Sequence, residues 1–572
     1  MVNIQQSVTA KYPLFQKMPS LVNKALFGAL GRLFHESDIN AFMRQHRHVG
    51  PFEFAEQVLE YFDFSYKVTR KDLENIPASG RVVIIANHPL GALDALSLID
   101  LVHSVRSDIK VVANDLLTQI DSLAPILIPV DVLGSGVDKG AVGRIYEALD
   151  REEAVIIFPS GEVSRARPTG IKDLKWHKGF LKFATRKAAP ILPVYIKAKN
   201  SALFYTVSSI NKKLSTALLI REMFAKEAKS LEFRIGELIP YPSYADKKLP
   251  NKTMVKLFQK HLYRVARGKT PIFATQRSIA HPENKQTLRR ELREALRLGT
   301  TGDGKEIYLF DAQKDSAVMR EIARLRELTF RKVEEGTGKR RDRDEYDLYY
   351  RHIVLWDAEA LEIVGAYRIG EGDYIREHYG IEGFYSDSLF RLQESFEPYL
   401  GNAVELERSF VQPRYWGSRA LDYLWQGIGA YLYRNPRVRY LFGPVSLSGS
   451  YPKGAQNLIL FYYQHYYGGG EEMLDPKRPF VMNRREREEV RALFCLDDPR
   501  KDLATLRKQL HCYGVTIPTL YKQYAELCEE GGIRFMGFNV DSDFNDCVDA
   551  FILVDLQKIK AKKKERYIWG DS

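Results

Sequence analysis

The chain has little cysteine, and its cysteines are not arranged to bind a metal or to form a disulfide framework. Four cysteines occur in 572 residues, all near the C-terminus and without a CxxC pair. Disulfide scaffolds and zinc sites use paired cysteines at short spacing, so free, reduced thiols are expected. No other set of metal-ligating residues has suitable spacing, and the sequence predicts no metal site.

Long apolar runs are missing too. The most apolar stretch, residues 82–102, is broken by an asparagine, a histidine and two aspartates, whereas a membrane-spanning helix needs roughly 18 to 20 consecutive apolar residues. The first residues also lack the order of an export signal, a positive region followed by an apolar one. The sequence therefore predicts a cytoplasmic protein that is soluble, or peripheral on the inner face of the membrane.

Neither an internal repeat nor a low-complexity segment is present, so the two halves are not copies of each other. Together they are too long for one hydrophobic core, because chains divide into domains beyond about 250 to 300 residues. The composition turns polar between Arg264 and Lys305, where a charged helical stretch ends in a glycine-rich turn. We predict domains over residues 1–265 and 305–572, joined by a linker over residues 266–304.

Positive charge, in contrast, is in excess. A net charge of +12 favours an anionic partner, which is nucleic acid, an anionic membrane face or an acidic carrier protein. No groove-reading motif accompanies the charge, so no nucleic acid is expected. The basic tail at 558–564 is either a solvated end or a surface for anionic lipid. An amphipathic pattern from Tyr12 to Leu30 favours membrane contact, although Pro19 interrupts it and a packed role fits equally well.

Short apolar runs alternate with helical stretches between residues 81 and 239. The runs are VVIIA (82–86), IKVVA (109–113), ILIPV (126–130), AVIIFP (154–159) and ILPVYIKA (191–198). Runs of this length separated by helices predict a largely parallel sheet covered on both faces, and so an α/β fold. In the second half, predicted strands over residues 306–310, 363–369 and 403–411 and helices ending near residues 325 and 433 indicate a twisted mixed sheet.

A histidine and a carboxylate, His88 and Asp94, lie on the turn that follows the first apolar run. Acyl transfer from a thioester to a hydroxyl needs a base that removes the hydroxyl proton and a group that holds the base in the right tautomer. A lone histidine after a buried strand is more often structural, so the neighbouring segments decide. Three follow in order: FPSGEVSR with Ser164 and Arg165, Lys178-Gly179 before a helix, and APILPV at 189–194.

In order and spacing these segments resemble the glycerolphosphate and lysophospholipid acyltransferase superfamily, over roughly residues 80–200. The resemblance implies that His88 is the general base, that Asp94 orients it, and that Ser164 and Arg165 bind the acceptor. Two departures from the family pattern stand out: five residues instead of four separate His88 from Asp94, and FPSGEVSR replaces FPEGTRS. Both look like the branch that includes amino-acid lipid O-acyltransferases.

Four blocks in the second half carry charged and aromatic residues in a fixed order. They read RELTF at 326–330, DEYD at 344–347, GAYR at 365–368 and ELER at 405–408. Acyl transfer to an amine needs a route for the ammonium proton, an oxyanion stabiliser and a channel for the pantetheine arm. On a regular strand Glu405 and Arg408 point to opposite faces, so a bulge or a splayed strand is needed to bring them together.

These blocks resemble the acyl-homoserine-lactone synthases and the related ornithine N-acyltransferases, which share RxxxF, DxxD, an arginine on the next strand and ExxR. The resemblance implies a GNAT-like mixed-sheet domain for this half. Residues 333–341 lack the tryptophan that the lactone synthases carry there, which favours the ornithine branch. The implied catalytic residues are Glu405 and Arg408, and the implied substrate-binding residues are Arg326, Phe330, Asp344, Asp347 and Arg368.

The acyl donor is inferred from the segment RYWGSR at residues 414–419. N-acetyltransferases hold the coenzyme A pyrophosphate in a turn of the form R/Q-x-x-G-x-G/A at the start of a helix. A bulky basic residue in the last position fits a single phosphate on an acidic acyl carrier protein better than coenzyme A. We expect Arg414, Gly417 and Arg419 to bind the phosphopantetheine thioester of this carrier protein, and we expect no tightly bound cofactor.

Over its whole length the chain is similar to the bifunctional ornithine lipid synthases. That resemblance implies that the second half joins a 3-hydroxyacyl group to the α-amine of ornithine, and that the first half then esterifies the lyso-lipid hydroxyl. The same two steps on glycine or another amino acid are an alternative, as is a lysophospholipid acyltransferase. A membrane-bound scaffold with a decayed first site is the alternative from another class, and the longer His-Asp spacing is its support.

Overall fold

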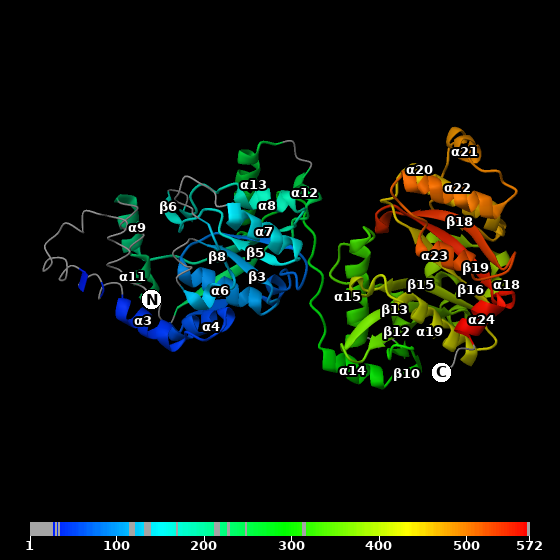
Figure 1. Cartoon of the computed structure of the whole chain (residues 1–572), viewed down its shortest axis with the longest axis horizontal. Helices are drawn as coiled ribbons and strands as arrows, with labels where there is room; N and C mark the ends of the chain where they lie inside the picture. Colours follow the sequence, from blue (N-terminus) through cyan, green and yellow to red (C-terminus); the bar gives the residue numbers. More distant parts are fainter. Residues whose placement is uncertain are drawn as a thin grey trace. The chain divides into compact units, whose positions relative to one another are not determined.

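The structure, a computed structural model, divides into two compact units, Met1–His281 and Pro282–Ser572 (Figure 1). It describes residues 27–28, 31, 35–113, 120–130, 139–167, 170–210, 218–225, 229–245, 249–311 and 316–568. The predicted amphipathic start lies almost entirely outside these residues.

Seven strands form one sheet in the described part of the first unit, in the order β1-β9-β8-β2-β5-β3-β4. Neighbouring strands run parallel except β8 and β9, which are antiparallel. The strands are β1 (Ser65–Lys67), β2 (Val82–Ala86), β3 (Ile109–Ala113), β4 (Leu127–Pro129), β5 (Ala154–Ile157), β8 (Ile191–Lys197) and β9 (Ser230–Ile235), and β6 (Arg165–Arg167) and β7 (Gly170–Lys172) form a separate hairpin.

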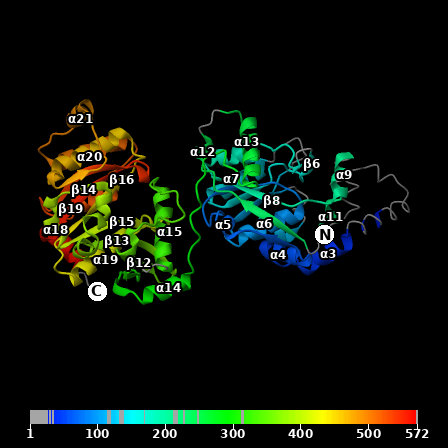
Figure 2. The same ribbon diagram turned by 180° about the vertical axis from the view of Figure 1, so that it is seen from behind.

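Helices cover both faces of this sheet, because alternate residues of the central strand β2 point to opposite sides. Val82 and Ile84 belong to a core shared with α4 and α6, whereas Val83 and Ile85 belong to a core shared with α7, α8 and α13 (Figure 2). The predicted α/β fold is confirmed. The described helices are α3 (Glu36–Gln45), α4 (Pro51–Tyr61), α5 (Arg70–Leu73), α6 (Ala92–His103), α7 (Lys139–Asp150), α8 (Gly179–Arg186), α9 (Ala202–Ile210), α11 (Leu219–Phe224), α12 (Pro242–Ala245) and α13 (Asn251–Val265).

The second unit is built on an eight-stranded mixed sheet in the order β10-β11-β12-β13-β15-β16-β19-β18, within the described residues. All neighbours are antiparallel except β15 and β16, which run parallel and pair only over residues 403–405 and 440–442. The strands are β10 (Leu296–Thr300), β11 (Glu306–Asp311), β12 (Arg351–Asp357), β13 (Glu362–Glu371), β15 (Ala403–Val411), β16 (Tyr440–Leu447), β18 (Ile533–Asp541) and β19 (Cys547–Asp555), with β14 (Phe390–Leu392) and β17 (Leu474–Pro476) apart.

Helices again lie on both faces of the sheet. One core joins the sheet to α19 and α20, and another joins it to α14 and α15. The predicted mixed-sheet domain is confirmed. The described helices are α14 (Lys285–Arg293), α15 (Ala317–Lys332), α16 (Gly372–Tyr379), α17 (Tyr385–Leu389), α18 (Glu397–Leu400), α19 (Ala420–Arg434), α20 (Lys453–Tyr467), α21 (Arg484–Arg491), α22 (Pro499–Cys512), α23 (Thr519–Ala525) and α24 (Ala561–Tyr567).

The boundary between the units differs from the predicted linker of residues 266–304. The chain divides after His281, and the rest of that segment belongs to the second unit. Leu288 and Leu292 of α14 are buried against α15, and β10 pairs with β11 at the edge of the sheet. The segment is polar in composition, but these two leucines lie four residues apart and therefore share one helix face.

The helix α24, which includes most of the basic tail, packs against the rest of the second unit at its last residue. Tyr567 of α24 donates a hydrogen bond from its hydroxyl to Asp422 (2.9 Å), and its backbone carbonyl lies against Gly429 of α19, where a Cβ would meet the oxygen at 1.8 Å. Of the helices in the described part of the chain, none combines the length and the apolar character that crossing a bilayer requires.

Candidate active sites

His88 follows β2 directly and meets Asp94, the third residue of α6. Nδ1 of His88 lies 2.8 Å from Oδ1 of Asp94, whose side chain is fully buried. The other carboxylate oxygen accepts hydrogen bonds from the backbone N–H groups of Leu90 (2.6 Å) and Gly91 (3.2 Å). A carboxylate in the first turn is also favoured by the helix dipole. Asp94 is therefore held in place and orients the imidazole, so that Nε2 is the ring nitrogen facing away from it.

The turn accommodates the five-residue spacing through Gly91. This residue precedes α6 with φ 100° and ψ −118°, a conformation that residues with a Cβ rarely adopt. The glycine reverses the chain early enough for Asp94 to reach back to His88. The longer spacing therefore does not separate the two side chains.

Asp173, which sequence reasoning missed, ties this turn to Ser164 and Trp176. It accepts hydrogen bonds from the His88 backbone N–H (3.2 Å), the Ser164 hydroxyl (2.5 Å) and the Trp176 indole (2.9 Å). Burial of the imidazole opposes its protonation, but Asp94 and then Asp173 outweigh burial and raise the pKa of His88 above its ordinary value. Asp173 had no signal in the sequence, because it is a single aspartate in a loop brought near by the fold.

The two predicted acceptor-binding residues have different surroundings. Ser164 is buried and supports the turn, since its backbone N–H donates to the His88 carbonyl (2.7 Å). Arg165 lies at the start of β6, where it donates to the Ser208 hydroxyl (2.7 Å) and its guanidinium lies 5.3 Å from the centre of the Phe204 ring. The structure therefore places Ser164 against the His88 segment and Arg165 against Ser208 and Phe204.

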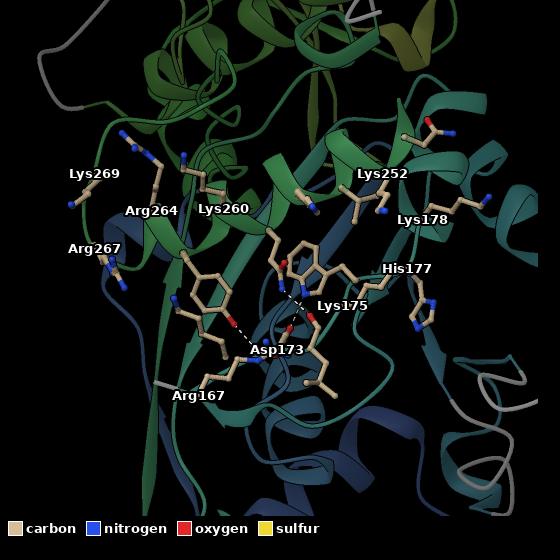
Figure 3. Close-up of a pocket in the computed structure, with 18 residues that line it drawn as sticks. Arg167, Asp173, Lys175, His177, Lys178, Lys252, Lys260, Arg264, Arg267 and Lys269 are labelled. Carbon is tan, nitrogen blue, oxygen red and sulfur yellow. Dashed lines mark hydrogen bonds between the residues drawn. The ribbon is translucent and has the colours of Figure 1, made fainter. Parts of the chain in front are cut away.

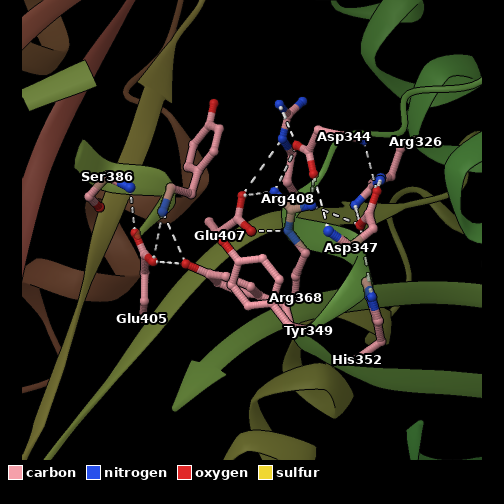
Figure 4. A network of polar contacts seen from close by, with 12 residues as sticks. Arg326, Asp344, Asp347, Tyr349, His352, Arg368, Ser386, Glu405, Glu407 and Arg408 are labelled. Atoms are coloured by element: carbon pink, nitrogen blue, oxygen red, sulfur yellow. Dashed lines mark hydrogen bonds and ion pairs between the residues drawn. The ribbon is translucent and has the colours of Figure 1, made fainter. Parts of the chain in front are cut away.

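In the second unit a buried ionic network joins α15, β13 and the 342–347 loop. Arg368 of β13 lies between Glu407 on one side and Asp344 and Asp347 on the other (Figure 4). Arg326 of α15 donates to both oxygens of Asp347, at 2.9 and 2.7 Å. Burial alone would disfavour the charge on Arg368, but the three carboxylates raise its pKa well above the ordinary value. Arg326, Asp347 and Arg368 are thus brought together fully inside the protein.

A bulge in β15 places Arg408 beside this network. Arg408 has φ 49°, and the register between β13 and β15 shifts between Ala366 and Arg368. Its guanidinium donates to Asp342 (2.9 Å) and Asp344 (3.4 Å). The predicted bulge is present, but it brings Arg408 to the carboxylates of the 342–347 loop. Among the contacts between described residues, none joins Arg408 to Glu405.

Glu405 is instead bound to a different loop. Its carboxylate accepts hydrogen bonds from the Tyr350 hydroxyl and from the backbone N–H groups of Tyr385 (3.2 Å) and Ser386 (2.7 Å). Its side chain is fully buried, and burial raises its pKa. Glu405 therefore fixes the start of α17, next to Arg408, whose guanidinium lies 5.0 Å from the centre of the Tyr385 ring.

The strands β15 and β16 separate just after Glu405. Their pairing ends at Glu405 and Phe442, and the next residue, Gly443, has φ 149° and lies so close to Leu406 that a Cβ would meet its carbonyl oxygen at 2.1 Å. Beyond this point the two strands form no ladder, so their backbone groups can bind an extended arm by strand addition. A splayed strand, one of the two ways in which the sequence analysis expected Glu405 and Arg408 to be brought together, is therefore present here in addition to the bulge at Arg408.

Three buried carboxylates that the sequence did not single out as a set lie at the far end of β16, β18 and β19. Ser446 of β16 is opposite Asp549 of β19, and its hydroxyl donates to Glu335 (3.2 Å). Asp541 ends β18 and precedes Phe544, whose ring centre lies 4.3 Å from the Arg408 guanidinium. Burial raises the pKa of Glu335 to about 7 and that of Asp549 well above its usual range.

The remaining predicted residues lie in α15 and in the turn before α19. Phe330 lies in the last turn of α15, with its ring centre 6.3 Å from that of Phe544. Arg414, Gly417 and Arg419 form the exposed turn before α19, where Gly417 has φ 79° and Arg414 donates to Glu362 (2.7 Å). Sequence reasoning missed Glu407 and Asp342 as members of this site. Glu407 lies inside the ELER block and Asp342 lies two residues before the DEYD block, so their nearness to these blocks could have pointed to them.

Two family models match the chain, one in each unit. Residues 13–261 match a model described as acyltransferase, and residues 325–426 match an acetyltransferase (GNAT) domain. Over 303 residues the chain is 34% identical to the glycine N(alpha)-acyltransferase of Bacteroides thetaiotaomicron, covering 51% of this chain and 89% of that protein. The chain belongs to the N(alpha)-acyltransferase family.

This N(alpha)-acyltransferase family member is also similar to proteins that are named for other acyl transfers. It is 29% identical over 228 residues to the lyso-glycine lipid O-acyltransferase of Phocaeicola vulgatus, covering 39% of this chain and 81% of that protein. It is 28% identical over 271 residues to the L-ornithine N(alpha)-acyltransferase of Rhodobacter capsulatus, covering 46% of this chain and 94% of that protein. The protein is thus an acyltransferase with an acyltransferase domain followed by a GNAT domain.

Proposed function

We propose that this protein makes an aminolipid by two acyl transfers, one in each unit. The second unit joins a 3-hydroxyacyl group to the α-amine of an amino acid, and the first unit esterifies the 3-hydroxyl of the resulting lyso-lipid. The observation that carries the proposal is the intact His88–Asp94 pair in a chain whose other unit holds a separate Arg368–Arg408 site. The same pair argues against a scaffold with a decayed first site.

In the first unit, Nε2 of His88 takes the proton of the lyso-lipid hydroxyl while its oxygen attacks the thioester carbonyl. The carbon–sulfur bond then breaks, and the imidazolium returns the proton to the departing thiolate. Asp94 holds the ring in the required tautomer and stabilises its charged form. Ser164 supports the turn, and Arg165 remains our candidate for binding the acceptor carboxylate.

In the second unit, the amino acid binds where the ionic network reaches the surface. Asp344 has 23% of its side chain exposed and Arg408 has 9%, whereas Arg326 and Arg368 have almost none. We assign the substrate carboxylate to Arg408 and the ammonium to the carboxylates Glu335, Asp541 and Asp549. Glu335 accepts the ammonium proton, since a base with a pKa near 7 is matched to that task. The amine then attacks the thioester carbonyl, and the thiol leaves.

Glu405 takes a positioning role in this proposal. Its hydrogen bonds to Tyr350, Tyr385 and Ser386 occupy the carboxylate, so it acts through the loop that places Tyr385 beside Arg408. Arg326, Asp347 and Arg368 are likewise assigned to holding Asp344 and Arg408 in place, and Phe330 to the wall of the site.

Glycine is our first candidate for the acceptor amino acid. The similarity to a glycine N(alpha)-acyltransferase is higher than that to the ornithine enzyme, at 34% against 28% identity, and a lyso-glycine lipid O-acyltransferase matches as well. Ornithine, the acceptor that the sequence predicted, is the second candidate. The observation in its favour is that three carboxylates lie near one site, enough to hold a second ammonium group.

An acyl carrier protein is proposed as the donor for both steps, at the surface of the membrane. Arg414 and Arg419 flank Gly417 on the exposed turn before α19, which suits a phosphate and an acidic protein face. Peripheral binding to the inner face of the membrane fits because the lyso-lipid product of one step is the substrate of the next.

The test is lipid mass spectrometry on a bacterial host that lacks aminolipids and expresses the full chain. Wild type should yield a diacylated amino-acid lipid, His88→Ala the lyso form, and Arg408→Ala neither product; the head-group mass names the acceptor. His103→Ala, at the far end of α6, is the matched control and should yield the diacylated lipid. Diacylated product from His88→Ala would remove the first site from the proposal.

A further inference from the structure

A groove of about 1140 Å³ in the first unit is lined mainly by cationic side chains. Ten lysines and arginines line it, contributed by residues 167–178, by α13 and by the segment that follows α13. Of the described residues that line it, Asp173 is the only carboxylate, and it is buried beneath the others (Figure 3). The groove is therefore an anion-binding surface by its charge.

Four of these cations form a row along α13. Lys252, Lys256, Lys260 and Arg264 follow one another at intervals of four residues, which places them on neighbouring turns of one face. Like charges at this spacing destabilise a helix, so the row is not explained by helix stability. None of the three lysines forms an ion pair with another described residue, and Arg264 donates to the carbonyl of Thr270 (2.6 Å). The row therefore faces solvent with the positive charge of its lysines not neutralised by a carboxylate of another described residue.

The floor of the groove is continuous with the turn that holds His88. The Tyr263 hydroxyl of α13 accepts a hydrogen bond from the backbone N–H of Asp173 (2.9 Å), and Gln259 donates to the carbonyl of Leu174 (3.0 Å). The carboxylate of Asp173 in turn holds the His88 backbone and Ser164. A partner bound in the groove is therefore adjacent to the segment that carries the base.

The shape and lining favour an acidic protein over a lipid bilayer. Membrane-binding surfaces present apolar side chains beside their cations, whereas Trp176 and Val255, which line this groove, are buried. The 15 residues of α13 extend over about 22 Å, long enough to run beside a helix of another protein. A row of carboxylates on such a helix would match the row on α13.

We propose that the groove docks the acidic acyl carrier protein that delivers the acyl group to the first unit. This inference rests on the proposed function, and it adds a partner surface for the ester-forming step that is separate from the Arg414–Arg419 turn of the second unit. Docking here lets the thioester arm extend from the carrier toward His88. Attraction between the two charged surfaces should make the binding weaken as salt is added.

Binding of acyl-loaded carrier protein to the full-length chain tests the proposal by titration calorimetry at low ionic strength. Lys256→Glu combined with Lys260→Glu should raise the Kd of one of the two carrier sites about tenfold or more and leave that of the Arg414–Arg419 turn unchanged, and Lys256→Gln with Lys260→Gln should give a smaller increase. Arg289→Glu with Arg290→Glu, on the exposed side of α14, makes the same change in net charge and should bind like wild type. Ester formation from acyl-pantetheine, a donor without a protein, should change less than twofold in the groove variants.

An unchanged Kd in the doubly reversed variant would overturn the proposal. So would an equal loss with both donors, because the lysines would then support the His88 site itself. Loss of binding to phosphatidylglycerol vesicles with carrier binding unchanged would assign the groove to the membrane. Carrier binding by a wild-type chain that forms no ester would contradict the proposed function while leaving the docking surface in place.

Discussion

His88 is half-buried and Arg368 is fully buried, and carboxylates beside each of them raise its pKa. Asp94 and Asp173 raise the pKa of His88 from an ordinary value of 6.5 against the effect of burial, so the neutral base becomes available only as pH rises. The guanidinium of Arg368 is held between three carboxylates that raise its pKa still further. The activity of the first site is therefore expected to depend on pH through the protonation of His88. The second site is expected to keep the charge on Arg368 at any pH at which the protein is folded.

Replacing Asp94 by Asn should change the pH dependence of ester formation. In wild type, kcat/KM should fall with decreasing pH around a midpoint above 6.5, the ordinary value for His88, because protonation removes the base. Asn lacks the charge that raises this pKa, so the midpoint should move to lower pH while the plateau rate drops about 100-fold or more. The measurement is kcat/KM for ester formation from about pH 5 to 9.

The control for this prediction is Asp100→Asn in the same helix, where the carboxylate accepts a hydrogen bond from Tyr66 (2.7 Å). It should leave the midpoint at the wild-type value. A midpoint that stays in place in Asp94→Asn would mean that another group is the titrating base.

Arg326→Ala should destabilise the second unit strongly. The change leaves Asp347, which is fully buried, with one arginine instead of two, and removing one partner of a buried ion pair costs about 3 to 5 kcal/mol. Lys332→Ala, an exposed position in the same helix, should stay within about 0.5 kcal/mol of wild type. The measurement is the free energy of unfolding in denaturant, and equal values for the two variants would contradict the prediction.

Elements were more predictable than contacts. The apolar runs at 82–86, 154–159 and 191–198 locate β2, β5 and β8 because strands buried on both faces need continuous apolar sequence. The period of two along β15 also indicated that a bulge was required. The partner of Arg408 was not predictable, because the register shift against β13 decides which carboxylates it meets. The role of Asp173 was not predictable either, because its contact with His88 joins residues that lie 85 positions apart in the sequence.

Gly443→Ala should disrupt the point where β15 and β16 part. A Cβ at this position meets the Leu406 carbonyl oxygen at 2.1 Å, and the backbone has φ 149°, so the substitution should cost about 1 to 3 kcal/mol through strain and slow amide formation more than ester formation. Gly299→Ala in the edge strand β10, where a Cβ meets nothing within 4 Å, is the matched control. Normal amide formation by Gly443→Ala would show that the strand separation is not used for the thioester arm.

Each unit has hydrophobic cores of its own. The cores around β2 consist of residues from the first unit, and the cores around α15 and α19 consist of residues from the second. The two proposed reactions are likewise distributed one to a unit, so the lyso-lipid is the chemical link between them. Fusion then supplies a high local concentration of the second enzyme to the product of the first, which needs no rigid arrangement of the units.

The fragment 282–572, expressed alone in a host without aminolipids, should accumulate the N-acylated lyso-lipid. The fragment 1–281, expressed beside it, should restore the diacylated lipid at a lower level, because the two units no longer share a chain.

The fragment 305–572, which begins where the sequence placed the second domain, is the control. It lacks α14 and β10, so Leu309 and the apolar side of α15 lose their cover, and it should fold poorly and form little lyso-lipid. Equal yields from the two C-terminal fragments would show that residues 282–304 are a linker after all, and a folded but inactive 282–572 would show that amide formation depends on the first unit.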